Sequence, residues 1–257
     1  MKIFIIGAGK MGSWLVEELC FDHDVAVFDV NPSHMKHFIN IKRFINLEEV
    51  REFNPDLLIN CVNLQITEKV FDQVIPMISE KCIIADIASV KNGLADYYRN
   101  SGRRFVSTHP MFGPTFGNVR NLSSENAIII KESDDEGKKF FHDLFDRVKL
   151  NIYEYTFEEH DRITAYSLST PFASSLVFAA CMKKIDAPGT TFRKHMEIAR
   201  GLLSEDDYLV SEILFNPYTL KQVESINQQL SYLTHIIKDR DYDEMVKFLE
   251  KLRENIK

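Results

Sequence analysis

The residues best able to carry out chemistry lie in the segment Ser107-Thr-His-Pro-Met-Phe-Gly-Pro114, where a histidine follows an apolar run. A neutral imidazole can take a proton from a substrate alcohol near pH 7. Pro110 and the Gly113-Pro114 pair restrict the backbone after His109, and an acid–base role requires a fixed ring. Without these neighbours, a loop histidine bonded only to the backbone would be the default interpretation. The segment therefore predicts His109 as a catalytic base.

A second polar cluster, Asp86-Ile-Ala-Ser-Val-Lys91, directly follows another apolar run. Residues just past the carboxyl ends of strands in an open α/β sheet face the ligand crevice. We therefore expect Ser89, Lys91 and His109 to converge near a bound nicotinamide, where the serine hydroxyl would orient the substrate alcohol. Ser89 also suits the N-cap of a following helix, and Lys91 suits a solvated position in its first turn. The residues leave both interpretations open.

A glycine-rich turn, Gly7-Ala-Gly-Lys-Met-Gly12, follows the first apolar run and opens a helical pattern. The first glycine permits the tight turn, the second lets a pyrophosphate approach the backbone, and the third lets helix and strand pack closely. Asp29 ends the next apolar run, where a carboxylate would bind a ribose hydroxyl and repel a 2′-phosphate, so the pattern favours NAD over NADP. The competing interpretation is an ordinary turn and a surface aspartate. The expected cofactor-binding residues are Gly7, Gly9, Lys10, Met11, Gly12 and Asp29.

The elements that must position these residues alternate between strands and helices. Apolar runs typical of strands covered on both faces lie at 3–6, 25–28, 57–60, 82–85, 105–107 and 127–130. Helix starts lie between them: Asn31-Pro32 suits an N-cap and first turn, and Ser133-Asp-Asp-Glu136 a capping box. This alternation predicts an α/β Rossmann-type fold with a doubly wound, mostly parallel sheet.

The later part of the chain has helical patterns only. Capping boxes at Thr156-Phe-Glu-Glu159 and Asp241-Tyr-Asp-Glu244 begin two of the helices. We therefore predict a Rossmann domain for NAD at residues 1–153 and an all-α helical domain for substrate binding and dimerisation at 154–257. The segment Ala165–Met182 is apolar around most of its girth and needs partners on several sides. It predicts a homodimer.

Composition excludes several classes of function. A net charge of −7 over 257 residues argues against nucleic acid. No apolar run of membrane-spanning length is evident, and the glycines of the first turn cut short an N-terminal run that could resemble a signal peptide. We therefore expect a cytoplasmic protein. The four cysteines, far apart and among apolar residues, suit reduced core thiols, with neither disulfides nor a metal site: Cys20, Cys61, Cys82 and Cys181.

Four motifs in order and at similar spacing resemble the prephenate dehydrogenases of tyrosine biosynthesis. They are Gly7-Ala-Gly-Lys-Met-Gly12, Asp86-Ile-Ala-Ser-Val-Lys-Asn-Gly93, His109-Pro-Met-Phe-Gly-Pro114 and Glu159-His-Asp161. The resemblance covers most of the chain, and the second and third motifs are far more specific than a glycine fingerprint. It implies NAD-dependent oxidative decarboxylation of prephenate to 4-hydroxyphenylpyruvate and carbon dioxide. Two further dehydrogenases, for arogenate and for β-hydroxyacids, stay open as alternatives, as does an NAD-sensing regulatory protein.

The resemblance also implies roles for particular residues. His109 would draw the proton of the ring hydroxyl, with Ser89 and Lys91 beside it. An arginine of the helical domain would bind a substrate carboxylate. Arg200, which matches the family better, and Arg193 are the candidates, and the alternative for either is a solvated charge on a helix face. Asp161 would orient the site or simply favour the helix start.

Other histidines carry less weight. His160, His195 and His142 lie in helical patterns, which favours a structural or exposed position. The chain also departs from the family at two places. Thr170-Pro171-Phe172 stands where some members have Leu-Pro-His, and Thr115 stands where an acidic residue often follows the His-Pro loop. Any function of those two missing side chains is therefore in doubt.

Overall fold

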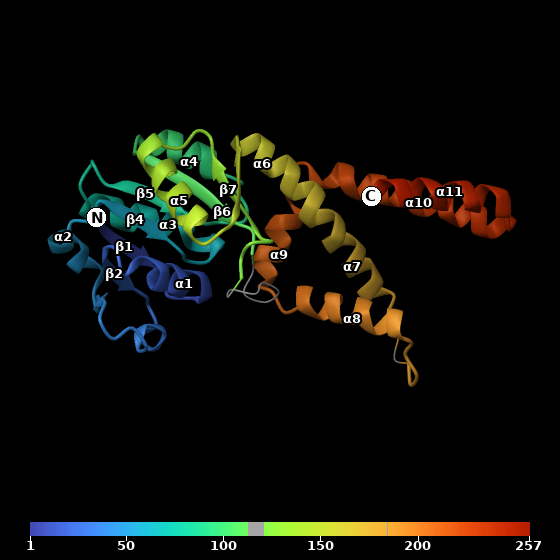
Figure 1. The fold of residues 1–257 in the computed structure, drawn as a ribbon, viewed down its shortest axis with the longest axis horizontal. Helices are drawn as coiled ribbons and strands as arrows, with labels where there is room; N and C mark the ends of the chain where they lie inside the picture. Colours follow the sequence, from blue (N-terminus) through green and yellow to red (C-terminus); the bar gives the residue numbers. More distant parts are fainter. Residues whose placement is uncertain (113–120, 184) are drawn as a thin grey trace.

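The structure is a computed structural model that describes residues 1–112, 121–183 and 185–257. The described residues form an eight-stranded sheet followed by a set of helices (Figure 1). The strands are β1 (Lys2–Ile6), β2 (Asp24–Phe28), β3 (Lys42–Arg43), β4 (Leu57–Asn60), β5 (Ile83–Asp86), β6 (Phe105–Pro110), β7 (Asn126–Ile130) and β8 (Asn151–Tyr155). The α-helices among them are α1 (Lys10–Leu19), α2 (Val50–Phe53), α3 (Thr67–Val74), α4 (Leu94–Ser101) and α5 (Asp135–Arg147). Short 3-10 turns are η1 (Pro32–Met35), η2 (Leu47–Glu49), η3 (Leu64–Ile66) and η4 (Ile75–Met77).

The sheet confirms the predicted doubly wound topology. Its strand order is β3-β2-β1-β4-β5-β6-β7-β8, and every neighbouring pair is parallel except β6 and β7. The winding reverses between β1 and β4, so the carboxyl ends of these two strands border the crevice where such sheets bind ligands.

All strands except β3 and β8, the two at the edges of the sheet, bury both of their faces, which explains the unbroken apolar runs. On β1, Ile3 and Ile5 belong to one hydrophobic cluster, whereas Phe4 and Ile6 belong to the other. The first cluster includes residues of α1 and α5, and the second includes residues of α3 and α4. Helices therefore cover both faces of the sheet, as a parallel sheet requires.

The expected helix starts are partly correct. Thr156 forms the predicted capping box and Asp241 is an N-cap. Asn31 also caps a helix, but η1 is a single 3-10 turn. The N-cap of α5 is Asp134, not Ser133, because the Ser133 hydroxyl accepts a hydrogen bond from the Ser107 amide instead, at 3.0 Å.

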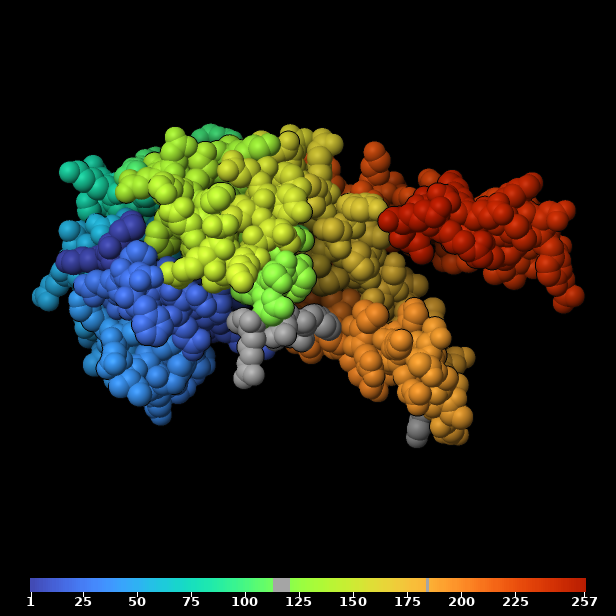
Figure 2. All heavy atoms as spheres, viewed as in Figure 1, coloured from blue at the N-terminus to red at the C-terminus, as the bar shows by residue number. Residues whose placement is uncertain are grey.

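The helices that follow the sheet form an extended arrangement. They are α6 (Phe157–Thr164), the π-helical turn η5 (Ala165–Ser169), α7 (Thr170–Ala180), α8 (Thr190–Leu202), α9 (Asp207–Leu214), α10 (Thr219–Asp239) and α11 (Tyr242–Asn255). The first three form one continuous helix that leads away from the sheet, and α10 and α11 project as a separate arm (Figures 1 and 2). The apolar α7, described throughout, has no buried residue, and Cys181, expected in a core, is exposed.

One continuous helix departs from the expectation that no apolar run spans a membrane. Phe157–Ala180 has 24 residues and a mean hydropathy of 1.2, which by length and composition is enough to cross a bilayer. Only 17% of its apolar window is buried within the chain. A single helix of this kind is weak evidence for a membrane, and its apolar surface is also what a subunit interface would cover.

Candidate active site

The glycine-rich turn lies at the crevice between β1 and β4 and has the shape of a phosphate cradle. Gly7 has a φ of +93° and lies against the Cys61 carbonyl, so a side chain there would be strained. A Cβ on Gly12 would lie 1.9 Å from the Gly7 carbonyl oxygen. A Cβ on Gly9 would meet nothing within 4 Å, and no side chain caps the start of α1 behind it. These residues fit a dinucleotide, because the open backbone and free amides of a helix start hold phosphate.

Asp29, at the end of β2, is tied to the same turn. Its Oδ2 accepts a hydrogen bond from the Ala8 amide at 2.7 Å, and its Oδ1 accepts one from the Asn31 amide at 2.7 Å. The carboxylate thus stands beside the cradle, at the position expected for a ribose partner. Lys10 and Met11 begin α1 at the same turn, with Lys10 exposed and Met11 partly buried.

His109 lies inside β6 and not in a loop after it, which corrects the sequence interpretation. It pairs with Ile128 across the antiparallel β6–β7 ladder and is only 6% exposed. A strand fixes the backbone of this residue more firmly than the expected loop would. Gly113, Pro114 and Thr115, on which part of the prediction depended, lie outside the described residues.

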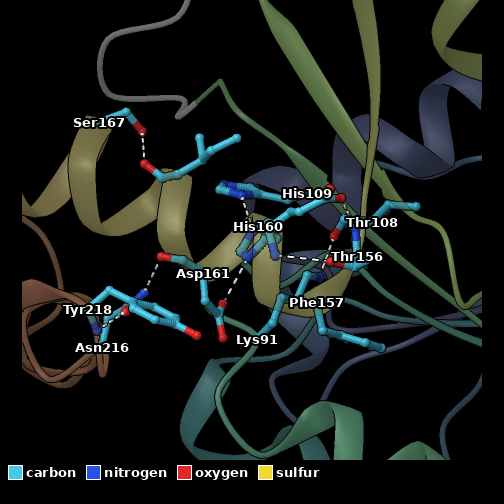
Figure 3. Close-up of polar contacts among 12 residues, drawn as sticks. Lys91, Thr108, His109, Thr156, Phe157, His160, Asp161, Ser167, Asn216 and Tyr218 are labelled. Carbon is cyan, nitrogen blue, oxygen red and sulfur yellow. Dashed lines mark hydrogen bonds and ion pairs between the residues drawn. The ribbon is translucent and has the colours of Figure 1, made fainter.

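The His109 ring is the first member of a chain of three side chains, of which the two histidine rings are buried (Figure 3). Its Nδ1 lies 2.9 Å from Nε2 of His160, and Nδ1 of His160 lies 3.0 Å from Oδ1 of Asp161. His160 is fully buried, so of the structural or exposed positions expected from the sequence it takes the structural one, but in direct contact with the candidate base. The signal that could have found it is the Glu159-His-Asp161 motif directly after a capping box.

Burial shifts the pKa values of these three groups in different directions. Burial lowers the pKa of His109 well below its ordinary value, helped by His160 and the charge of Lys91. Burial and then the Lys91 charge lower the pKa of His160 to about 3. Burial raises the pKa of Asp161 to about 6, against the opposing effect of Lys91. Near pH 7 both imidazoles are therefore neutral and Asp161 is ionised.

Lys91 fits neither of its two interpretations. Its Nζ lies 2.6 Å from Oδ1 of Asp86 and donates to the Thr108 carbonyl at 2.7 Å, and the ammonium is fully buried. The Tyr98 hydroxyl binds the other oxygen of Asp86 at 2.6 Å. Lys91 is thus neither solvated nor turned to the cavity of His109, and instead ties the loop after β5 to β6. Burial lowers its pKa against the opposing charge of Asp86.

A cavity of about 600 Å³ lies in front of His109, between the sheet and the helices. Ser89 lines it together with His109, as expected, and Met11 of the glycine-rich turn lines it as well. Ser89 is not an N-cap, because α4 begins at Leu94 behind Gly93. Thr164 also lines the cavity, and its buried hydroxyl has no hydrogen-bond partner among the described residues. Phe172, at the position of the missing family histidine, makes part of the apolar wall.

The two arginines do not join this cavity within one chain. Ile198 and Leu202 of α8 face it, whereas Arg193 and Arg200 are exposed and line a different cavity of about 520 Å³. The charged side chains that line the His109 cavity are Glu125 and Glu205, with no lysine or arginine among the described residues that line it. Within one chain, therefore, the arginines predicted to bind the substrate carboxylate lie away from His109, the predicted base.

No metal centre accompanies this site in the part of the chain that the structure describes. No group of three or more His, Cys, Asp or Glu side chains there could hold a metal ion.

Comparisons with known proteins agree with this architecture. Residues 15–150, more than half of the chain, match the family model "Prephenate dehydrogenase, nucleotide-binding domain". The match covers Asp29, Ser89, Lys91 and His109 and confirms that the sheet domain binds a nucleotide. A crystal structure of prephenate dehydrogenase from A. aeolicus, in complex with hydroxyphenyl propionate and NAD+, has a TM-score of 0.85 at 19% identity, over 99% of this chain and 96% of that one. At this identity the likeness shows the fold alone.

Two curated relatives are named for related substrates. A probable arogenate/prephenate dehydrogenase of Methanocaldococcus jannaschii is 23% identical over 221 residues, which are 80% of this chain and 48% of the relative. Arogenate dehydrogenase 1, chloroplastic, of Arabidopsis thaliana is 26% identical over 243 residues, 87% of this chain and 37% of the relative. The chain therefore spans about half the length, or less, of these relatives.

Proposed function

Because the chain belongs to the prephenate dehydrogenase family, we propose that it catalyses the NAD-dependent oxidative decarboxylation of prephenate to 4-hydroxyphenylpyruvate and carbon dioxide. One observation carries this proposal. A single cavity is lined by Met11 of the cofactor turn and by both Ser89 and His109. A substrate alcohol in that cavity would therefore meet a base, a hydroxyl and the cofactor together.

The residues of the chain divide the chemistry among them. His109, neutral because burial lowers its pKa, takes the proton of the ring hydroxyl. The Ser89 hydroxyl orients the same oxygen. The Thr164 hydroxyl, which has no partner among the described residues, hydrogen-bonds another polar group of the substrate. Bound NAD supplies the hydride acceptor. Loss of the ring carboxylate as carbon dioxide then leaves an aromatic ring, which draws the reaction forward.

The preference for NAD over NADP depends on Asp29. Its carboxylate, held by the Ala8 amide at 2.7 Å, would bind a ribose hydroxyl and repel a 2′-phosphate. The remaining cofactor residues are those of the turn: Gly7, Gly9, Lys10, Met11 and Gly12.

The substrate clamp of this proposal comes from α8 of a second copy. Arg200, with Arg193 as the alternative, faces away from the His109 cavity of its own chain. The apolar helices leave large side chains uncovered: Val177 is 56% exposed, Leu220 68% and Ile237 61%. We expect a homodimer to cover these faces and to place the partner's α8 at the cavity. The domain boundary between residues 153 and 154 stays a prediction, as does the cytoplasmic location.

The decisive experiment compares substrates side by side. Prephenate and arogenate are each incubated with NAD, and both NADH absorbance and released carbon dioxide are measured. We expect turnover of prephenate with equal yields of both products. Turnover of arogenate alone would show that arogenate, and not prephenate, is the substrate. Cofactor binding measured by calorimetry, without turnover of either compound, would favour the NAD-sensing alternative.

A further inference from the structure

We propose that His160 and Asp161 are positioning residues that hold His109 with its proton on Nδ1 and its Nε2 lone pair free for the substrate. The inference deepens the proposed function and relies on it for the role of His109. It begins from the buried chain of contacts that leads from β6 into α6, two elements that are far apart in the sequence (Figure 3).

The order of donors in this chain follows from its last member. An ionised carboxylate only accepts hydrogen bonds, so Nδ1 of His160 must donate to Oδ1 of Asp161 across 3.0 Å. A neutral imidazole has one N–H, which leaves Nε2 of His160 as an acceptor. The proton between the two rings, 2.9 Å apart, therefore belongs to Nδ1 of His109. Nε2 of His109 is left unprotonated, as a base requires.

The scaffold holds both positioning residues in place. His160 is fully buried one turn after the Thr156 capping box, so its ring orientation is set by packing and by its two partners. The Asn216 amide, between α9 and α10, donates to the backbone carbonyl of Asp161 at 2.9 Å. Asn216 is itself 95% buried, being 5% exposed. The helical half thus fixes the ring that the sheet presents.

The chain of contacts can also store the substrate proton. The hydroxyl proton passes to Nε2 of His109 as two electrons leave the substrate as hydride. The Nδ1 proton of His109 can then shift to Nε2 of His160, whose positive charge lies beside Asp161. After carbon dioxide leaves, the ring oxygen is a phenolate, and the protons return in the reverse order. The enzyme ends in its starting protonation state, and no net proton is released.

Asp161 also touches solvent on the far side of this chain of contacts. It lines a separate cavity of about 600 Å³, which His109 does not line, and its side chain is 18% exposed. Its charge therefore responds to the pH of the medium on the side of this chain of contacts that faces away from the His109 cavity. The charged and titratable groups around it are His160, Glu158, Lys91, Arg99, Glu132 and Tyr218.

The first test reads the tautomer directly, without substrate. Long-range ¹H–¹⁵N spectra of the histidine rings report which nitrogen carries the proton. We expect the proton of His109 on Nδ1 in the wild type and a mixture of tautomers in Asp161→Asn, because an amide can also donate to His160. A wild-type His109 protonated on Nε2 would overturn the inference. This result is independent of which substrate the enzyme uses.

The second test is kinetic and uses matched variants. Asp161→Asn should lower kcat about ten- to a hundredfold with KM within about twofold, since the substrate touches neither positioning residue. Glu158→Gln, an exposed acid on the same helix and the same outer cavity, should leave kcat unchanged. His160→Gln keeps an acceptor for the His109 proton and should retain more activity than His160→Leu. Equal activity of these two variants would contradict the inference.

The third test is the pH profile of kcat. Burial raises the pKa of Asp161 to about 6, so its charge is present above that pH and is lost as the pH falls through it. His109 is not the source of this loss, because its pKa lies well below the ordinary value. We expect kcat of the wild type to fall below about pH 6 and the profile of Asp161→Asn to lack that step. The same step in both proteins would show that another group controls it.

Discussion

The buried ion pair between Lys91 and Asp86 allows a sharp test of how the site is held together. Replacing Lys91 with Met keeps the length of the side chain and removes the ammonium. The change breaks the 2.6 Å contact with Asp86 and the 2.7 Å hydrogen bond to the Thr108 carbonyl. Both charged side chains are at most 1% exposed, so water cannot replace the lost partner.

The expected cost follows from leaving a carboxylate buried without its cation. Breaking a buried pair on one side costs about 3–5 kcal/mol. Here the carboxylate keeps hydrogen bonds from the Tyr98 hydroxyl at 2.6 Å and the Ala88 amide at 2.9 Å. We therefore expect the low end, about 3 kcal/mol, or roughly a hundredfold in the folding equilibrium constant.

Urea denaturation can measure this loss through one intrinsic probe. Trp14 is the single tryptophan of the chain and lies in the core of the sheet domain, 6% exposed. The double variant Asp86→Asn/Lys91→Met should lose less stability than Lys91→Met alone, because no charge is left unpaired. Lys139→Met, which breaks an exposed pair with Asp143, is the control and should leave the midpoint unchanged. A loss below about 1 kcal/mol for Lys91→Met, or an equal loss in the double variant, would refute this reasoning.

Four further predictions concern the active site and its assembly. His109→Asn should keep NAD binding, measured by calorimetry, and lower kcat at least about a hundredfold, and full activity would contradict its role as base. Thr164→Val should raise KM and also raise the thermal midpoint, because it removes a buried hydroxyl that bonds to none of the residues the structure describes. An unchanged KM would exclude contact between Thr164 and the substrate. Light scattering should give a dimer at micromolar concentration. When His109→Asn and Arg200→Ala subunits are mixed and reassembled, about a quarter of wild-type activity should return, because half of the dimers would be mixed and each of these would hold one complete site. No recovery would place the arginine in the same chain as the base.

The sequence predicted the sheet and the cofactor turn because their signals are local. A strand covered on both faces reads as an unbroken apolar run, and the positive φ of Gly7 requires a residue without a side chain. Ser89 was found for the same reason, because parallel strands end at one edge of the sheet and the serine lies in the loop that follows β5. The strand position of His109 was missed, since the antiparallel β7 that pairs with it comes after an intervening segment.

Local sequence patterns were thus enough to predict the fold class, the cofactor cradle and a candidate base. The surroundings of that base became visible only in the folded chain: His160 meets His109 across 51 positions of the chain, and Lys91 turns inward to Asp86. The tertiary structure also sets where the Arg200 side chain points, because this depends on which face of α8 packs on the cavity. The physical reason is that such contacts depend on how helices dock on a sheet. Docking depends on the shapes of both surfaces together, and neither periodicity nor local propensity encodes it.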